Sequence, residues 1–192
     1  VFYQFHSGAP SSEIYLKAVQ ELIGNARKEL APLGITSPQF IETGGAVPTA
    51  VQTEQPDKLI AAYSDALIAI ADRDERIVAL DADLILDTGL IPFRDRFPER
   101  FIECGIAEQD MVSQAGAMAG QGKLPFVHSF ACFLTTRPNE QIYNNASENR
   151  KVVYAGSLAG ILPAGPGHSH QAVRDIASLN GIPGLIQIQP SC

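Results

Sequence analysis

Residues 98–122 read PERFIECGIAEQDMVSQAGAMAGQG, and they change from a strand pattern to a helix pattern. The first part, residues 101–104, is a short run of the kind that forms buried strands. From Gly105 onward, apolar and small residues recur at helical spacing, so we expect the chain to turn from strand into helix there. Glu108 then falls in the first helical turn. A carboxylate there interacts favourably with free backbone N–H groups, and its position alone favours this structural role over catalysis.

The composition excludes several classes of protein. The chain has 192 residues, 45% of them hydrophobic, which is enough to bury the core of one ordinary domain, alone or with an attached piece. Its 14 basic and 21 acidic residues give a formal charge of -7, which disfavours nucleic acid or an anionic membrane as the main partner. No apolar run has the length of a membrane span, and the N-terminus lacks the pattern of a signal peptide. We therefore predict a cytoplasmic protein that binds neither nucleic acid nor a membrane.

Helix and strand patterns alternate along the chain. A helix is expected from Ser11 or Ser12 to about Leu30, and a connector rich in proline and glycine follows over residues 32–56, with a domain boundary near residue 50. Beyond it, strands are predicted at residues 76–80, 101–104, 125–130, 151–155 and 184–188, separated by helices. The strands are continuous apolar runs, so we predict an α/β fold with a parallel sheet covered by helices on both faces.

Polar and aromatic segments follow four of the predicted strands, namely Asp81 and Asp83, residues 105–108, 129–133 and 165–171. Because ligands of parallel sheets bind at the carboxyl ends of the strands, we expect these segments to converge on one edge. Taken one at a time, they have simpler explanations. Phe130 and Phe133 are more typical of a core, and a His-x-His pair without a third ligand is weak evidence for a metal. We therefore predict no metal site in this chain.

Taken together, these segments resemble the pyrimidine-binding domain of transketolases and 1-deoxyxylulose-5-phosphate synthases. The resemblance covers about residues 57 to 192. It is carried by four motifs: LDADL at residues 80–84, FPERFIECGIAEQ at 97–109, PFV at 125–127 with the F-x-x-F of Phe130 and Phe133, and HQ at 170–171 followed by DIA at 175–177. It implies that residues 51–192 form the pyrimidine-binding domain. Residues 1–50 are then the tail of a preceding diphosphate-binding domain plus a linker.

The resemblance implies that thiamine diphosphate is the cofactor. Glu108 matches the glutamate that hydrogen-bonds N1′ of the aminopyrimidine, an interaction that favours loss of the thiazolium C2 proton. Phe130 matches the aromatic residue that packs on the pyrimidine, and Phe133 lines the same pocket. Asp83 matches an acidic residue beside the cofactor, and His170 matches a histidine that contacts sugar hydroxyls or the enol intermediate.

The resemblance also implies that this chain supplies half of the site. In the family, a GDG-to-Asn segment of a separate domain holds the diphosphate through magnesium, and no such segment occurs here, so we expect the magnesium ligands elsewhere. FHSGAP at residues 5–10 is similar to the closing H-G-x-P of that domain, which would place His6 near the diphosphate. We expect a homodimer, or a heteromer with a diphosphate-binding subunit. Because the sequence starts at Val1 and stops just after a predicted strand, we also expect a fragment of a longer protein.

Three positions depart from the family pattern. Pro166 replaces an acid that reads the donor sugar, Arg174 stands where an acid is usual, and Thr136 stands where some transketolases carry tyrosine. We predict part of a transketolase-like transferase of carbohydrate metabolism that moves a two-carbon ketol unit between sugar phosphates or related sugars. The alternatives are a condensation of the 1-deoxyxylulose-5-phosphate synthase type, or a noncatalytic fragment or subunit that retains the fold.

Overall fold

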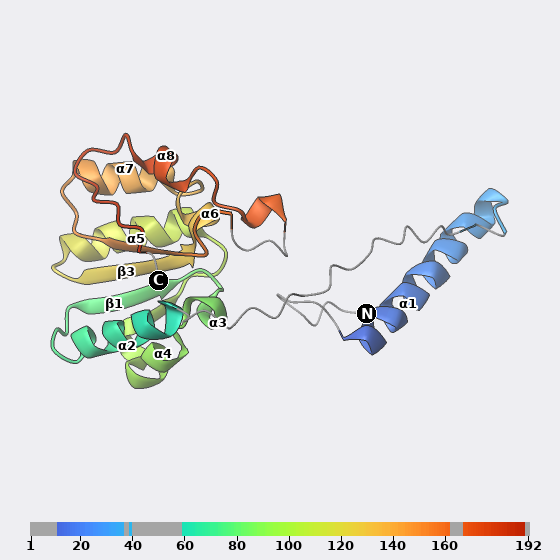
Figure 1. The fold of residues 1–192 in the computed structure, drawn as a ribbon, viewed down its shortest axis with the longest axis horizontal. Helices are drawn as coiled ribbons and strands as arrows, with labels where there is room; N and C mark the ends of the chain where they lie inside the picture. Colours follow the sequence, from blue (N-terminus) through green and yellow to red (C-terminus); the bar gives the residue numbers. More distant parts are fainter. Residues whose placement is uncertain (1–10, 37–38, 40–58, 162–166, 191–192) are drawn as a thin grey trace. The chain divides into compact units, whose positions relative to one another are not determined.

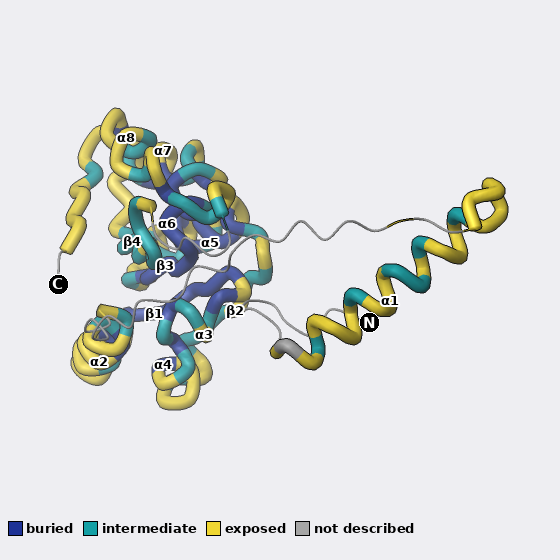
Figure 2. Tube along the Cα trace, turned by 45° about the vertical axis from the view of Figure 1, so that its right-hand side comes forward, coloured by how far each residue is buried: buried dark blue, intermediate teal, exposed yellow. Residues whose placement is uncertain are grey.

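The computed structural model describes residues 11–36, 39, 59–161 and 167–190, and the chain forms two compact units, Val1–Gln52 and Thr53–Cys192. The first unit contains α1 (Ser12–Leu30) and a short 3₁₀ helix, η1 (Ala31–Leu33) (Figure 1). α1 begins where predicted because the Ser11 hydroxyl accepts a hydrogen bond from the backbone N–H of Ile14. None of the described side chains of α1 is buried (Figure 2).

A parallel sheet forms the centre of the second unit. Within the described residues its strands are β1 (Ile77–Asp81), β2 (Phe101–Glu103), β3 (Leu124–Phe130) and β4 (Val153–Ser157), in the order β2-β1-β3-β4. β1 is buried along its whole length, and β3 is buried except at its first residue (Figure 2). Continuous apolar runs are suited to such strands because helices cover both of their faces. The predicted α/β fold with a parallel sheet is confirmed.

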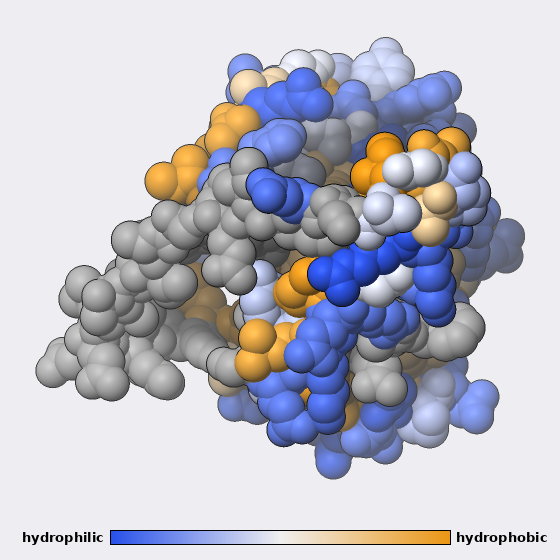
Figure 3. All heavy atoms as spheres, turned by 90° about the vertical axis from the view of Figure 1, so that its right-hand side faces the viewer, coloured by the Kyte–Doolittle hydropathy of each residue, from blue (hydrophilic) through white to orange (hydrophobic). Residues whose placement is uncertain are grey.

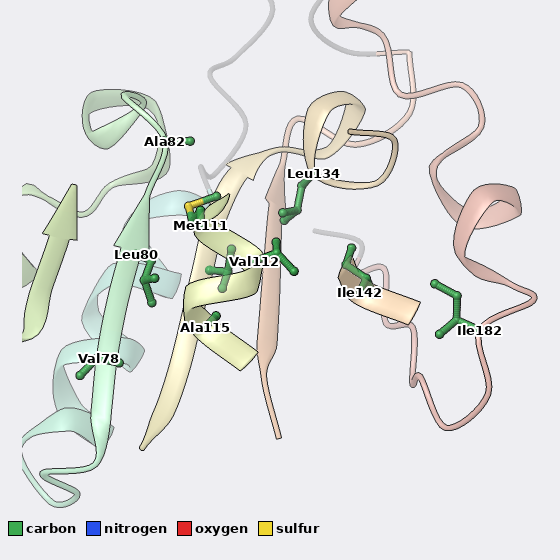
Figure 4. Packing of buried hydrophobic residues seen from close by; sticks show 10 residues of the cluster. Val78, Leu80, Ala82, Met111, Val112, Ala115, Leu134, Ile142 and Ile182 are labelled. Carbon is green, nitrogen blue, oxygen red and sulfur yellow. The ribbon is translucent and has the colours of Figure 1, made fainter. Parts of the chain in front are cut away.

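The helices of the second unit lie on both faces of the sheet (Figure 1). Alternate residues of β1 point to opposite faces. Ile77 and Ala79 therefore pack in a core cluster with residues of α2 (Leu59–Ala71) and α4 (Ile91–Arg96), while Val78 and Leu80 pack in another cluster with residues of α5 (Glu108–Gly120). Figure 4 shows side chains of the cluster that contains Val78 and Leu80, among them Met111 and Val112 of α5. None of the helices in the described segments is long and apolar enough to cross a membrane. The helical elements are α2 (Leu59–Ala71), α3 (Ile85–Thr88), α4 (Ile91–Arg96), η2 (Pro98–Arg100), α5 (Glu108–Gly120), α6 (Ala131–Leu134), α7 (Asn139–Ser147), η3 (His168–His170) and α8 (Asp175–Leu179).

Helices α5 and α7 approach closely at Gly116. A Cβ atom added there would lie 1.9 Å from Oδ1 of Asn145, a buried residue of α7. The Asn145 side chain is fixed, because its Nδ2 donates to the carbonyl oxygen of Val112 at 3.0 Å and lies 3.1 Å from the hydroxyl of Tyr154. Only glycine fits at position 116 while Asn145 keeps this position.

Two sequence predictions need correction. Residues 184–188 were predicted to be a strand, but they pair with no described strand, and Ile186 and Ile188 are more than 80% exposed. The helix predicted to start at Gly105 begins instead at Glu108, because Gly105 has a left-handed φ of 65° and Ala107 has non-helical dihedral angles. Glu108 is nevertheless in the first helical turn, as predicted.

Candidate functional site

Glu108 is a buried acid at the carboxyl edge of the sheet. The chain leaves β2, turns at Gly105 and enters α5 at Glu108, which is only 3% exposed. The next two residues, Gln109 and Asp110, are exposed, so the turn directs one particular side chain inward. Burying a carboxylate is costly unless it is paired, so its partner determines what this residue can do.

The partner of Glu108 is Arg137. Nη1 of Arg137 lies 2.5 Å from Oε1 of Glu108, and the same guanidinium lies 3.9 Å from the ring centroid of Phe133. Arg137 therefore joins the buried acid to an aromatic side chain through an ion pair and a cation–π contact. The sequence prediction missed Arg137. The sequence does contain a usable signal, because Arg137 comes four residues after Phe133 and side chains at this spacing are neighbours on a helix. In the structure the backbone N–H of Arg137 donates to the Phe133 carbonyl oxygen and closes such a helical turn.

Phe130, Phe133 and His170 form one aromatic cluster. The ring centroids of Phe130 and Phe133 are 5.9 Å apart, and His170 lies 6.1 Å from the first and 5.1 Å from the second. Phe130 is the last residue of β3, Phe133 follows one turn later in α6, and His170 comes from η3. The structure thus brings together side chains from two segments that follow different strands, as the sequence predicted for this edge.

The two aspartates after β1 have different surroundings. Asp81 is fully buried, and its carboxylate accepts hydrogen bonds from the Leu84 backbone N–H at 2.6 Å and the Thr88 hydroxyl at 2.9 Å, which gives it a structural role at the start of α3. Asp83 is exposed and has a left-handed φ of 60°, a conformation that is unfavourable for a residue other than glycine. Its backbone N–H donates to Oε1 of Glu103 at 2.9 Å.

These contacts connect four of the predicted site residues. Glu108 contacts Arg137, Arg137 contacts Phe133, and Phe133 contacts His170, which also lies against Phe130. The backbone hydrogen bond of Asp83 goes instead to the end of β2. His6 and Pro166 lie outside the described residues. In the described segments, no three His, Cys, Asp or Glu side chains are grouped in a way that could hold a metal ion.

Asp81 and His128 are both buried, and burial shifts their pKa values in opposite directions. Burial raises the pKa of Asp81 from 3.8 to about 6, helped by the charges of Glu103 and Asp83 and opposed by its two hydrogen bonds. Burial lowers the pKa of His128 from 6.5 to about 4, against smaller effects of backbone hydrogen bonds. Its Nδ1 lies 3.0 Å from the Leu80 carbonyl oxygen, so Nδ1 carries the hydrogen and Nε2 accepts from the Tyr63 hydroxyl at 2.6 Å.

The opposite shifts give a prediction about pH. As the pH falls from 6 to 4, His128 makes the folded state less stable, because its imidazole binds a proton more readily in the unfolded state. Asp81 makes the folded state more stable, because its carboxylate binds a proton more readily in the folded state. The two effects nearly cancel. Asp81→Asn removes one of them, so its free energy of unfolding should fall by roughly 2–3 kcal/mol more than that of the wild type between pH 6 and 4. Urea denaturation at pH 4, 5 and 6 measures this, with the exposed Asp65→Asn as control. Equal pH dependence in Asp81→Asn and wild type would contradict the assignment.

Comparison with known proteins identifies what this arrangement is similar to. A family model described as "Transketolase, pyrimidine binding domain" matches residues 57–192. The 6-deoxy-6-sulfo-D-fructose transketolase subunit SqwH of Clostridium sp. (strain MSTE9) is 36% identical over 129 residues, which are 67% of this chain and 40% of that protein. The 1-deoxy-D-xylulose-5-phosphate synthase of Natranaerobius thermophilus is 35% identical over 155 residues, 81% of this chain and 24% of that protein.

A solved structure gives the same result at the level of the fold. That structure, described as "Split gene transketolase, inactive beta4 tetramer", has a TM-score of 0.55 and 38% sequence identity, and the match covers 64% of this chain and 40% of that one. The chain therefore spans between 24% and 40% of the length of the proteins with which it is compared.

Proposed function

The chain belongs to the transketolase family, whose pyrimidine-binding domain it contains, and we propose that it is part of a thiamine-diphosphate-dependent enzyme that transfers a two-carbon ketol unit between sugar phosphates or related sugars. The observation that carries the proposal is the buried carboxylate of Glu108 beside the aromatic cluster at the carboxyl edge of the sheet. Ligands of parallel α/β folds bind at this edge.

The residues present fit the aminopyrimidine end of the cofactor. A flat heteroaromatic ring needs aromatic side chains to pack on and a buried acceptor for its protonated nitrogen, and Phe130, Phe133 and Glu108 supply these. Oε1 of Glu108 is engaged by Arg137, whereas no hydrogen bond among the described residues uses Oε2. Oε2 is therefore available to N1′ while Arg137 holds the other oxygen.

Each residue then has a defined task. When bound, thiamine diphosphate supplies the nucleophilic carbon and stores the electrons of the broken carbon–carbon bond. Glu108 holds the proton at N1′, and Phe130 and Phe133 fix the plane of the pyrimidine. Arg137 orients the Glu108 carboxylate, and His170 is placed beside the pyrimidine pocket, where it can donate to a sugar oxygen.

We propose that another domain or subunit binds the diphosphate and its magnesium ion, in a homodimer or a heteromer. One relative is named as a transketolase subunit, and the similar solved structure is described as an inactive tetramer of β chains. Figure 3 shows hydrophobic side chains exposed among hydrophilic ones. Three exposed apolar residues follow strand ends, as expected for a partner that covers this edge: Leu86, Ile106 and Ile161.

A condensation of the 1-deoxyxylulose-5-phosphate synthase type is the second candidate. The match to the synthase of Natranaerobius thermophilus extends over 81% of this chain. The donor is the point of difference, and the position that usually reads it is Pro166 here. Product analysis of the assembled enzyme decides between the candidates, because only the synthase type forms 1-deoxyxylulose 5-phosphate.

Calorimetry of the assembled enzyme, in which this chain is joined by the domain or subunit that binds the diphosphate, tests the proposed site with thiamine diphosphate and Mg²⁺. We expect binding, weakened about tenfold or more by Phe133→Ala, because stacking on an aromatic ring contributes roughly 1–3 kcal/mol. Tyr143→Ala, which truncates an exposed aromatic residue of α7, is the matched control and should bind like the wild type. Equal affinity of the Phe133→Ala and Tyr143→Ala variants would rule out this pocket as the pyrimidine site.

A further inference from the structure

One oxygen of Glu103 connects two loops of the candidate site. Glu103 is the last residue of β2 and lies opposite Asp81 in the register of β1 and β2. Its Oε1 accepts a hydrogen bond from the backbone N–H of Asp83 at 2.9 Å and another from that of Gly105 at 2.8 Å. The loop that follows β1 and the loop that follows β2 are therefore joined through a single acceptor atom.

Both hydrogen-bonded residues have unusual backbone conformations. Asp83 has a φ of 60° and Gly105 a φ of 65°, and the left-handed region is disfavoured for an aspartate. A residue in such a conformation persists only where its surroundings hold it there. The charge-assisted hydrogen bond from the Asp83 N–H to Glu103 is one such restraint.

Each loop carries a residue proposed for the cofactor site. Asp83 is itself one of them, and Glu108 begins α5 three residues after Gly105. Glu103 also has an electrostatic cost at this position, because its charge contributes to the raised pKa values of Asp81 and Cys104. Glutamine, a neutral acceptor of similar shape, would avoid that cost. A glutamine substitution at position 103 therefore separates the effect of the acceptor oxygen from the effect of the charge.

We propose that Glu103 is a positioning residue that sets the distance and orientation between the Asp83 loop and the Gly105–Glu108 turn. The proposal rests on the function proposed above for Asp83 and Glu108. Glu103 acts through backbone N–H groups and touches neither substrate nor cofactor. Its function requires an acceptor oxygen at the Oε1 position, and glutamine can provide one.

The test compares Glu103→Gln, Glu103→Ala and the control Glu99→Ala in the full chain. Glu99 is an exposed acid in η2, at the opposite end of β2. NMR should show the amide protons of Asp83 and Gly105 shifted upfield, and exchanging faster with solvent, in Glu103→Ala, and close to wild type in Glu103→Gln and Glu99→Ala. In the assembled enzyme, with the partner that binds the diphosphate present, calorimetry should show thiamine diphosphate and Mg²⁺ binding about tenfold more weakly to Glu103→Ala, with affinity restored by Glu103→Gln.

The outcomes separate this proposal from the proposed function. Unchanged amide signals in Glu103→Ala overturn the positioning role, and so does a Glu103→Gln variant that behaves like Glu103→Ala, since charge would then be the cause. Altered amide signals in Glu103→Ala, together with no cofactor binding to the assembled wild-type enzyme, support the joining of the loops and contradict the cofactor site. If Glu103→Ala does not fold, Glu103→Asp, which withdraws the carboxylate by one methylene, is expected to give the same upfield shifts.

Discussion

Replacing Glu108 with alanine in the assembled enzyme is expected to reduce the exchange of the C2 proton of bound thiamine diphosphate by at least a hundredfold. Glu108 is 3% exposed, so water cannot readily take over the hydrogen bond proposed for N1′. A positioned acid or base contributes roughly 10²–10⁴-fold to proton transfer, and this loss removes the whole contribution. Hydrogen–deuterium exchange at C2, stopped by acid and followed by NMR, measures the rate.

Two controls make the Glu108 result specific. Gln109→Ala changes the exposed neighbour on α5 and should leave the exchange rate unchanged. Circular dichroism should show that Glu108→Ala is folded, because the Arg137 side chain is 38% exposed and can be hydrated once its partner is gone. Exchange at the wild-type rate in a folded Glu108→Ala enzyme with cofactor bound would falsify the role given to this residue.

Gly116→Ala is expected to destabilise the second unit by about 2–4 kcal/mol. The added Cβ would meet Oδ1 of Asn145 at 1.9 Å, so the buried amide must move and weaken its contacts with Val112 and Tyr154. Overpacking and buried groups left without partners each cost about 1–3 kcal/mol. Alanine favours a helix over glycine by about 1 kcal/mol, which offsets only part of this. Chemical denaturation monitored by circular dichroism gives the difference.

Gly181 and Asn145 provide the comparison for this prediction. No atom lies within 4 Å of a Cβ built at Gly181, whose φ is not left-handed, so Gly181→Ala should change stability by less than about 0.5 kcal/mol. Combining Gly116→Ala with Asn145→Ala frees the space that the new methyl group needs. The double variant should therefore be more stable than the sum of the two single effects predicts. Strict additivity would show that the two positions do not collide.

The sheet was predictable because apolar-rich strand patterns alternate with helix patterns along the chain, and the Ser11 cap marked the start of α1. Residues 184–188 misled because a sequence of strand composition still needs a neighbouring strand to pair with. Glu108 could be placed from helical spacing, but its pairing with Arg137 could not, since side-chain contacts depend on how turns pack. The two hydrogen bonds of Glu103 could not be predicted either. They depend on the left-handed backbone conformations of Asp83 and Gly105, which the local sequence does not indicate.

The contacts that complete the candidate site join residues that are far apart in the sequence. Asp83 and Glu103 are 20 positions apart in the sequence, and Glu108 and Arg137 are 29 apart. The last of these contacts along the chain is the one between Phe133 and His170. During synthesis, the ribosome must therefore release residues up to η3 before the aromatic cluster can form. Such long-range contacts slow folding, and a nascent chain that ends before β4 exposes the edge of β3 to any other strand in reach.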